Sequence, residues 1–97
     1  MYYIVFERQV LKDIKLLKQA NLTEKAKSLV DVLRENPFQN PPRYEALVGN
    51  LQGLFSRRIS FQHRMVYQVF EGKVKYEKVQ YDGVVKIIRL WTHYDKI

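Results

Sequence analysis

Hydrophobic positions along the chain follow two different periods. Residues 2–7, YYIVFE, form a run of aromatic and β-branched side chains without a breaker, which predicts a strand. Residues 10–18 and 22–33 instead place apolar side chains three or four positions apart, with lysines between them, as amphipathic helices do. Only a few residues separate these two segments, so we expect them to form an antiparallel helical hairpin.

The limits of the second helix are marked by its flanking residues. Asn21 can cap the first turn, and Glu24 lies three residues later, which is the spacing of a capping box. Pro37 disfavours helical backbone at the residue before it, so this helix must end by Asn36. The buried face of the first helix is expected to comprise Val10, Leu11, Ile14 and Leu17.

Residues 37–55 hold all three prolines of the chain. We interpret this stretch as an ordered surface loop and not as a linker, because it contains several side chains that can anchor it. Loops on a rigid scaffold often carry functional residues. The anchoring side chains are expected to be Phe38, Tyr44, Leu47 and Leu51.

The second half of the chain has the aromatic and β-branched composition of strands, in residues 54–60, 64–70 and 84–94. Residues 61–64, FQHR, supply the first turn. The second connection, residues 71–83, is longer and has Asp82-Gly83 as its turn signal, although its alternation indicates that the hairpin arms extend into it. The order β-α-α-β-β-β predicts one α+β domain over residues 1–97, with a small antiparallel sheet packed against the N-terminal helical hairpin.

Strand alternation sorts the side chains of these segments onto two faces. The face covered by the helices is expected to include Met65, Tyr67, Val69, Ile88 and Leu90. Arg57 falls on this apolar face and is expected to reach the sheet edge. The open face is expected to present Arg58, Arg64, Arg89, Trp91 and His93. Such a surface suits RNA, because guanidinium groups bind phosphate and aromatic planes stack on unpaired bases; the alternative is a solvated sheet face with a half-buried tryptophan.

The charge distribution also favours a polyanionic partner. The chain has 17 Lys and Arg against 10 Asp and Glu, a formal net charge of +7 at pH 7. Residues 54–97 contribute 9 basic and 4 acidic groups, or +5, whereas residues 1–53 contribute 8 and 6, or +2. A positive field attracts nucleic acid or an acidic protein segment. The simpler alternative is that the lysines and arginines only keep a small domain soluble.

Composition excludes several other classes of protein. The chain has no cysteine, which excludes disulfides and cysteine-based zinc sites. With two histidines it offers little for a transition-metal site, although carboxylates could hold magnesium, and we expect no cofactor. The apolar run at residues 1–6 is too short for a signal peptide or a membrane span, so we expect a cytoplasmic protein.

Residues 36–70 and the C-terminal THY motif resemble the RelE/ParE superfamily of bacterial toxins, specifically its Txe/YoeB branch. The matching features are Pro37-Phe38, Glu45 with Leu47, NLQGLFSRRI at 50–59, HRMVY at 63–67 and His93-Tyr94. The first 35 residues match only in the order of elements and in helical character. The resemblance implies ribosome-dependent cleavage of messenger RNA in the ribosomal A site. It also implies an antitoxin whose acidic, partly disordered tail covers the active face, and leaves open whether the free protein forms a homodimer.

The same resemblance implies a role for each of three residues in attack by the RNA 2′-hydroxyl. Glu45 would be the general base, Arg64 the phosphate ligand and His93 the general acid. The types of side chain suit these roles, because arginine stays charged at any working pH and histidine exchanges a proton near neutrality. Further contacts with the RNA are expected from Arg57, Arg58, Arg89, Trp91 and Tyr94.

Each candidate has a structural alternative: Glu45 as a helix cap, Arg64 in an ion pair with Glu71 or Glu77, and His93 or Tyr94 as packed or surface side chains. Two features also depart from the family pattern. Val48 stands where relatives tend to carry a lysine, so Arg58, Arg43 or ribosomal groups would have to replace that lysine. The segment of residues 71–83 is also longer than expected.

Two other functions remain open, namely a basic binding module without chemistry and a ParE-like toxin acting on DNA gyrase.

Overall fold

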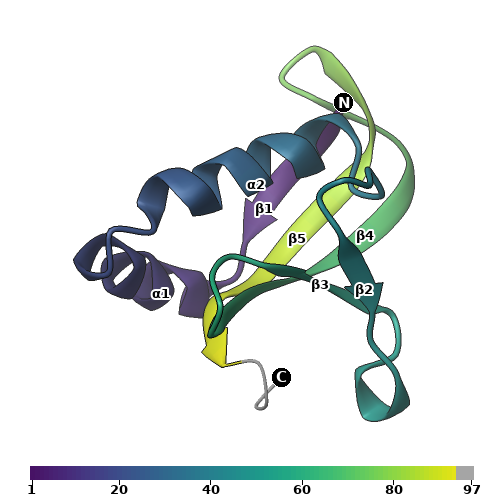
Figure 1. Cartoon of the computed structure of the whole chain (residues 1–97). Coiled ribbons are helices and arrows are strands. Elements are labelled where there is room, and N and C mark those ends of the chain that lie inside the picture. Colours follow the sequence, from purple (N-terminus) through teal and green to yellow (C-terminus); the bar gives the residue numbers. More distant parts are fainter. Residues whose placement is uncertain (94–97) are drawn as a thin grey trace.

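The computed structural model describes residues 1–93, with His93 described by its backbone alone. The fold is α+β, as predicted, and Figure 1 shows two helices packed against a five-stranded sheet. Along the chain the elements are β1 (Tyr2–Phe6), α1 (Arg8–Gln19), α2 (Thr23–Glu35), β2 (Tyr44–Ala46), the 3-10 turn η1 (Gly49–Leu51), β3 (Leu54–Arg58), β4 (His63–Tyr76) and β5 (Val79–His93). Neither helix of this part of the chain has both the length and the apolarity needed to cross a bilayer.

The sheet has the order β1-β5-β4-β3-β2. All neighbours are antiparallel, as predicted, except β1 and β5, which run parallel at one edge of the sheet. These two strands are separated by both helices and three strands, and therefore no hairpin turn fixes their relative direction. Residues 37–55 were predicted to form an ordered surface loop, and within this stretch Tyr44–Ala46 instead forms β2, which pairs with β3 as the other edge of the sheet.

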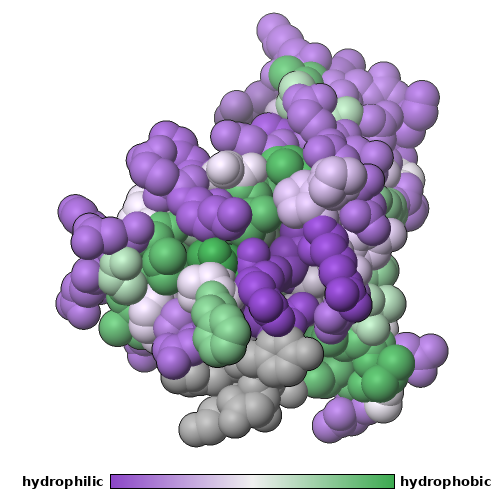
Figure 2. Space-filling view, viewed as in Figure 1, coloured by the Kyte–Doolittle hydropathy of each residue, from purple (hydrophilic) through white to green (hydrophobic). Residues whose placement is uncertain are grey.

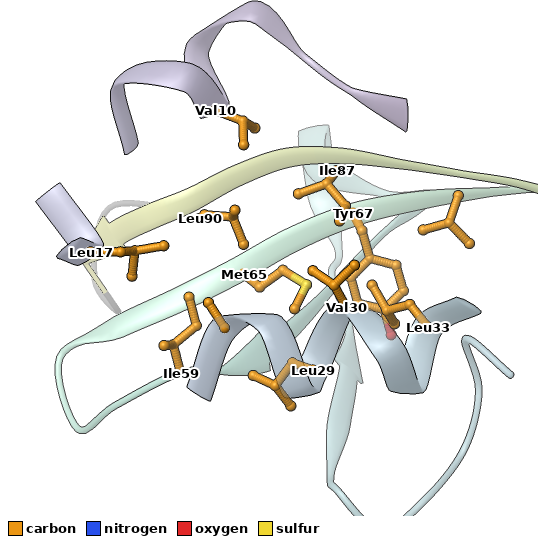
Figure 3. Close-up of a cluster of buried hydrophobic side chains, with 12 residues drawn as sticks. Val10, Leu17, Leu29, Val30, Leu33, Ile59, Met65, Tyr67, Ile87 and Leu90 are labelled. Carbon is orange, nitrogen blue, oxygen red and sulfur yellow. The ribbon is translucent and has the colours of Figure 1, made fainter. Parts of the chain in front are cut away.

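Helix α2 covers one face of the sheet and closes the hydrophobic core. Figure 3 shows Leu29 and Leu33 of α2 facing Met65 and Tyr67 of β4. Full burial of one such aliphatic side chain contributes roughly 1.5–3 kcal/mol to the free energy of unfolding. The complete buried cluster comprises Val10, Leu17, Ala26, Leu29, Val30, Leu33, Ile59, Met65, Tyr67, Val85, Ile87 and Leu90.

Helix α1 lies beside the last residues of β5 and not flat on the sheet (Figure 1). Strand β1 pairs with β5 only as far as Ile87, and α1 then occupies the free edge. The carboxylate of Asp13, which is 0% exposed, accepts a hydrogen bond from the Leu90 backbone N–H at 2.9 Å and one from Arg89 Nε at 2.9 Å. Leu11, predicted to be buried, is 62% exposed, because the helix turns Asp13 inward.

The start of α2 differs from the prediction, whereas its end agrees. Asn21 has a positive φ of 58°, and the residue that precedes the helix is Leu22, without a side-chain capping bond. The predicted capping box is therefore wrong. The helix ends at Glu35, and Asn36 has the extended backbone expected before Pro37.

The β4–β5 hairpin turns at Glu77-Lys78 and not at Asp82-Gly83. Both turn residues have positive φ, 50° and 69°, as a two-residue type I′ turn requires. The predicted extension of the hairpin arms is confirmed, since the strands reach Tyr76 and Val79. Gly83 instead lies within β5, where a Cβ would collide with the Phe70 carbonyl oxygen.

A buried arginine closes the loop between α2 and β2. The guanidinium of Arg57, on β3, donates to the carbonyl oxygens of Pro37 at 3.0 Å and Gln39 at 2.8 Å, and also to that of Pro42. Arg57 is 0% exposed. It lies on the apolar face, as alternation predicted, but it ends beneath this loop and not at an open sheet edge.

The hydroxyl of Tyr67 completes this buried network. It donates to the Pro37 carbonyl oxygen at 2.9 Å and accepts a hydrogen bond from Arg57 Nε at 3.2 Å. Burial raises the pKa of Tyr67 to about 12, although the nearby guanidinium acts in the opposite direction. The folded state therefore strongly favours the protonated hydroxyl.

We expect Asp13→Ala to lower the free energy of unfolding by about 3–5 kcal/mol, because it leaves the Leu90 N–H and the Arg89 guanidinium without their acceptor. Urea denaturation followed by circular dichroism measures this change. Asp31→Ala is the control, since Asp31 forms only an exposed ion pair with Arg34, and its effect should stay below about 1 kcal/mol. Equal losses in both variants would contradict the role given to Asp13.

We also expect a loss of stability at alkaline pH that depends on Tyr67. Its pKa in the fold is about 12, above the unfolded value of about 10. The resulting stabilisation is complete below pH 10 and disappears as the pH rises from 10 towards 12. Tyr67→Phe should be less stable than the parent protein at pH 7, by about 1–3 kcal/mol, yet show a flatter decline between pH 10 and 12. Denaturation midpoints measured across this pH range give both slopes.

Candidate active site

Three neighbouring strands bring the predicted catalytic carboxylate and arginines to one end of the sheet. Glu45 on β2 is the register partner of Ser56 on β3. Two residues further along β3, Arg58 is the partner of Arg64 on β4. Directly opposed residues of antiparallel strands project from the same face, so these four side chains share one surface.

The surface is hollowed into a pocket of about 260 Å³ lined by Arg43, Glu45, Arg58 and Arg64. Figure 2 shows strongly hydrophilic side chains gathered over β2 and β3, in the middle of that view. Three guanidinium groups around one carboxylate make this pocket strongly cationic. Such a pocket favours an anionic ligand, and guanidinium geometry matches the oxygens of a phosphate.

Arg64 is held rigidly at the base of this pocket. It is only 4% exposed, and its Nε donates to the Ser56 hydroxyl at 2.5 Å. Its Nη2 lies 3.4 Å from Glu45 Oε2. The alternative ion pairs of Arg64 with Glu71 or Glu77 do not occur among the ion pairs of the described residues. The guanidinium is thus oriented before any ligand arrives, which lowers the cost of reorganisation.

The carboxylate of Glu45 lies between two arginines. Besides Arg64, Arg43 approaches it, with Nη2 at 3.7 Å from Oε1. The side chain of Glu45 is 38% exposed, so a ligand in the pocket can reach its oxygens. Glu45 lies in a strand, and the alternative of a helix cap is therefore wrong.

The two C-terminal candidates are only partly described. The Cα of His93 is the register partner of that of His63, and the next pair along the strands is Arg64 with Thr92. The backbone of His93 therefore lies one residue pair from Arg64. The side chain of His93 and the whole of Tyr94 fall outside the described residues.

Arg89 and Trp91 do not line the pocket, so the predicted common face is corrected for these residues. Arg89 binds the Asp13 carboxylate and the Trp91 carbonyl oxygen, at 2.9 and 2.7 Å. The ring of Trp91 stacks on that of His63, with centroids 3.7 Å apart and planes 18° apart, and it packs against the core.

The cause of this error is a change of register between β4 and β5. Their pairing shifts by one residue between Arg64 and Val66 and again between Val66 and Tyr67. One shift reverses the facing of the side chains that follow and the second restores it, so β5 departs from simple alternation between Ile87 and Thr92. The same shifts explain why Ile87 is buried in the core in place of the predicted Ile88.

Arg57 and His63 also differ from the predictions. Arg57 is buried beneath residues 37–42 with its guanidinium bound to carbonyl oxygens, so it cannot reach a substrate in the pocket. His63 was assigned to a turn, but it begins β4 and is 7% exposed.

Ser56 is a member of the site that sequence reasoning did not single out. It precedes Arg58 by two positions, so strand alternation puts both on one face, but only the fold shows its bond to Arg64. Arg43 was considered only as a replacement for the lysine that relatives carry at the position of Val48. Val48 is 80% exposed and outside the residues that line the pocket, whereas Arg43 and Arg58 both line it.

Within residues 1–92, no group of three or more His, Asp or Glu side chains is arranged to hold a metal ion. The chemical groups that this part of the chain assembles are a carboxylate that can accept a proton and guanidinium groups that can bind an anion.

Comparisons with known proteins place this geometry in a family. Residues 6–94 match the family model of the YoeB-like toxin of bacterial type II toxin–antitoxin systems. Toxin YoeB of Synechocystis sp. is 37% identical over 67 residues, which are 69% of this chain and 67% of that toxin. Toxin YoeB of Escherichia coli K12 is 36% identical over 53 residues, which cover 55% of this chain and 63% of that toxin.

Solved structures agree over nearly the whole chain. The YoeB/ParE toxin from Agrobacterium tumefaciens superposes with a TM-score of 0.76 at 26% identity, covering 95% of this chain and 99% of that one. The toxin in the heterotetrameric YoeB–YefM toxin–antitoxin complex from Staphylococcus aureus gives a TM-score of 0.69 at 27% identity, with 97% and 99% covered. Together with the match over residues 6–94, these findings show that the chain belongs to the YoeB-like toxins of bacterial type II toxin–antitoxin systems.

Proposed function

We propose that this toxin is a ribosome-dependent endoribonuclease that cleaves messenger RNA in the ribosomal A site and thereby stops translation in the cytoplasm. The observation that carries the proposal is the placement of Glu45 Oε2 3.4 Å from Arg64 Nη2 within one cationic pocket. This arrangement pairs a proton acceptor with a phosphate ligand. A protein that only binds RNA, or only blocks a partner, has no need of a general base beside its phosphate site.

Glu45 is the proposed general base. Its exposed carboxylate takes the proton of the ribose 2′-hydroxyl, and the 2′-oxygen then attacks the adjacent phosphorus. Arg64 and Arg58 bind the non-bridging oxygens of this phosphate and offset the charge that develops in the transition state. The 5′-oxygen leaves with a proton from the proposed general acid, His93, and a 2′,3′-cyclic phosphate remains on the other fragment. Proton transfer by a positioned base or acid contributes roughly 10²–10⁴-fold each.

In this proposal the ribosome supplies the alignment of the RNA strand, which this small site does not provide. Among the described residues the pocket comprises about 260 Å³ and four lining side chains, which is little to align a flexible RNA strand for in-line attack. Messenger RNA held by the ribosome is already extended and restrained, so the toxin needs only to bring its acid–base groups to the phosphate. The net charge of +7 favours docking onto the polyanionic ribosome.

We expect Glu45→Ala to lower the single-turnover rate of messenger cleavage on programmed ribosomes by about 10²–10⁴-fold, and His93→Gln by a similar factor. Gel analysis of end-labelled messenger measures both rates. Glu35→Ala, at the exposed end of α2, is the matched control and should cleave at the parental rate. Full activity of the Glu45 variant would refute the proposal. Intact messenger together with DNA damage after induction would instead identify a gyrase-directed toxin.

We further propose that the cognate antitoxin inhibits the toxin with an acidic segment that lies on this pocket. The YoeB of S. aureus occurs in a complex with its antitoxin YefM, and the three arginines here offer matching charge for carboxylates. A short gene beside the toxin gene that encodes an acidic C-terminal half would identify this partner.

With that antitoxin, we expect the double variant Arg43→Ala/Arg58→Ala to bind about tenfold more weakly in calorimetry, with a smaller dependence on salt, because rim charges contribute affinity that salt screens. Lys73→Ala/Lys75→Ala, on the distant β4–β5 hairpin, removes the same number of charges. If both double variants lose affinity equally, the antitoxin recognises net charge and not this pocket.

A further inference from the structure

The guanidinium of Arg57 is buried without an acidic partner among the described residues. None of the ion pairs within residues 1–92 includes it. Its donors go to the carbonyl oxygens of Pro37, Gln39 and Pro42 and to the Tyr67 hydroxyl. Burying a charge in this way is costly, and only a dense set of hydrogen bonds makes it tolerable.

The atoms that Arg57 binds lie on the segment that leads into the candidate active site. Pro42 is three residues before Glu45. Tyr44, next to Glu45, is the register partner of Arg57, and its ring centroid lies 5.0 Å from the Arg57 Cζ. Arg57 therefore binds the loop that leads to Glu45 and also contacts Tyr44, the residue directly before Glu45.

Besides Arg57, strand β2 is held by a short ladder and by the packing of the Tyr44 ring against Phe38 and Phe55. It is three residues long, lies at the edge of the sheet and pairs only with β3. Short edge strands are among the least stable parts of a sheet, because few ladder bonds and little buried area hold them. The loop before β2 thus decides where the Glu45 carboxylate lies.

Through two adjacent residues, strand β3 connects the pocket of Glu45 and Arg64 with the loop that Arg57 binds. Ser56 projects towards the pocket, where it is paired with Glu45 and bonded to Arg64. Arg57 projects from the opposite face and anchors the loop. A single rigid strand thereby sets the distance between the carboxylate and the phosphate-binding guanidinium.

We propose that Arg57 is a positioning residue of the cleavage reaction, which holds the segment 37–45 so that Glu45 stays beside Arg64. The inference rests on the proposed function, because it assigns Arg57 to the general base of that reaction. Arg57 does not touch the substrate. A displacement of a catalytic group by about 1 Å can cost 10²-fold in rate, so a buried residue outside the pocket can control the chemical step.

The first test is Arg57→Met, which keeps most of the side-chain volume and removes the donors. We expect single-turnover cleavage on saturating ribosomes to fall about 10–100-fold, while the half-saturating ribosome concentration changes less than threefold, since Arg58 and Arg64 remain. Arg57→Lys should recover part of the rate, because one ammonium group can bind some but not all of the three carbonyls. Arg34→Met, at an exposed i,i+3 ion pair, is the matched control and should retain the parental rate.

A double-mutant cycle separates positioning from general loss of structure. If Arg57 acts through Glu45, then Arg57→Met should have no further effect on the rate in the Glu45→Ala background. Multiplicative losses would overturn the inference, and so would parental activity of Arg57→Met. If instead Glu45→Ala itself is fully active, the proposed function fails, which is a different outcome.

Hydrogen exchange supplies a readout that does not depend on activity. In Arg57→Met the amides of residues 39–46 should exchange at least tenfold faster, while those of α2 and of the central part of β4 keep their protection. Uniformly faster exchange would show a global defect and overturn the local role. Tyr67→Phe, which removes one bond of the same loop with less disturbance, should shift the rate and the exchange in the same direction by smaller factors, and its failure to do so would also count against the inference.

Discussion

The double pairing of β3, with β2 on one side and β4 on the other, is the constraint on which the rest of the site depends. Its ladder with β2 fixes Glu45 opposite Ser56, and its ladder with β4 fixes Arg58 opposite Arg64. Backbone hydrogen bonds therefore set the spacing of the charged groups, and long flexible side chains have only to bridge short distances. Because the alternate residues of β3 point to opposite faces, the same five residues also hold the loop that precedes Glu45.

Repulsion between positively charged side chains is concentrated around β3. Three guanidinium groups share a pocket with one carboxylate, and a fourth is buried on the other face. Like charges so close together repel, and the fold tolerates them because Ser56 and backbone carbonyls accept hydrogen bonds from two of them and Glu45 forms ion pairs with Arg43 and Arg64. Sites that are strained in this way are typical of function, since the binding of an anion relieves the repulsion. In the proposed reaction that anion is the scissile phosphate, and in the proposed inhibited state it is an acidic segment.

Much of the candidate site was predictable because its residues lie in a recognisable motif and on strands that keep regular alternation. Glu45, Arg58 and Arg64 were expected together and the structure brings them together, whereas Arg89 and Trp91 were expected there and lie elsewhere. The difference is physical. A regular strand keeps its alternation, which sequence shows, but two single-residue shifts between β4 and β5 interrupt it between Ile87 and Thr92, and no residue in the sequence marks them. Asp13 was missed for a related reason, because hydrophobic periodicity counts apolar residues and cannot recognise a buried carboxylate whose partner lies 77 positions away.

The sequence by itself determined the class of fold, the two helices, most strand segments and the family, because periodicity and local motifs are properties of neighbouring residues. Only the tertiary structure decided the parallel placement of β1, the edge strand β2, the register of β5 and the burial of Arg57. Each of these results from contacts between segments far apart in the chain, whose free energies depend on how hydrogen bonds and apolar surfaces are shared once the whole sheet has formed. The local sequence does not show how these hydrogen bonds and apolar surfaces are divided among distant segments.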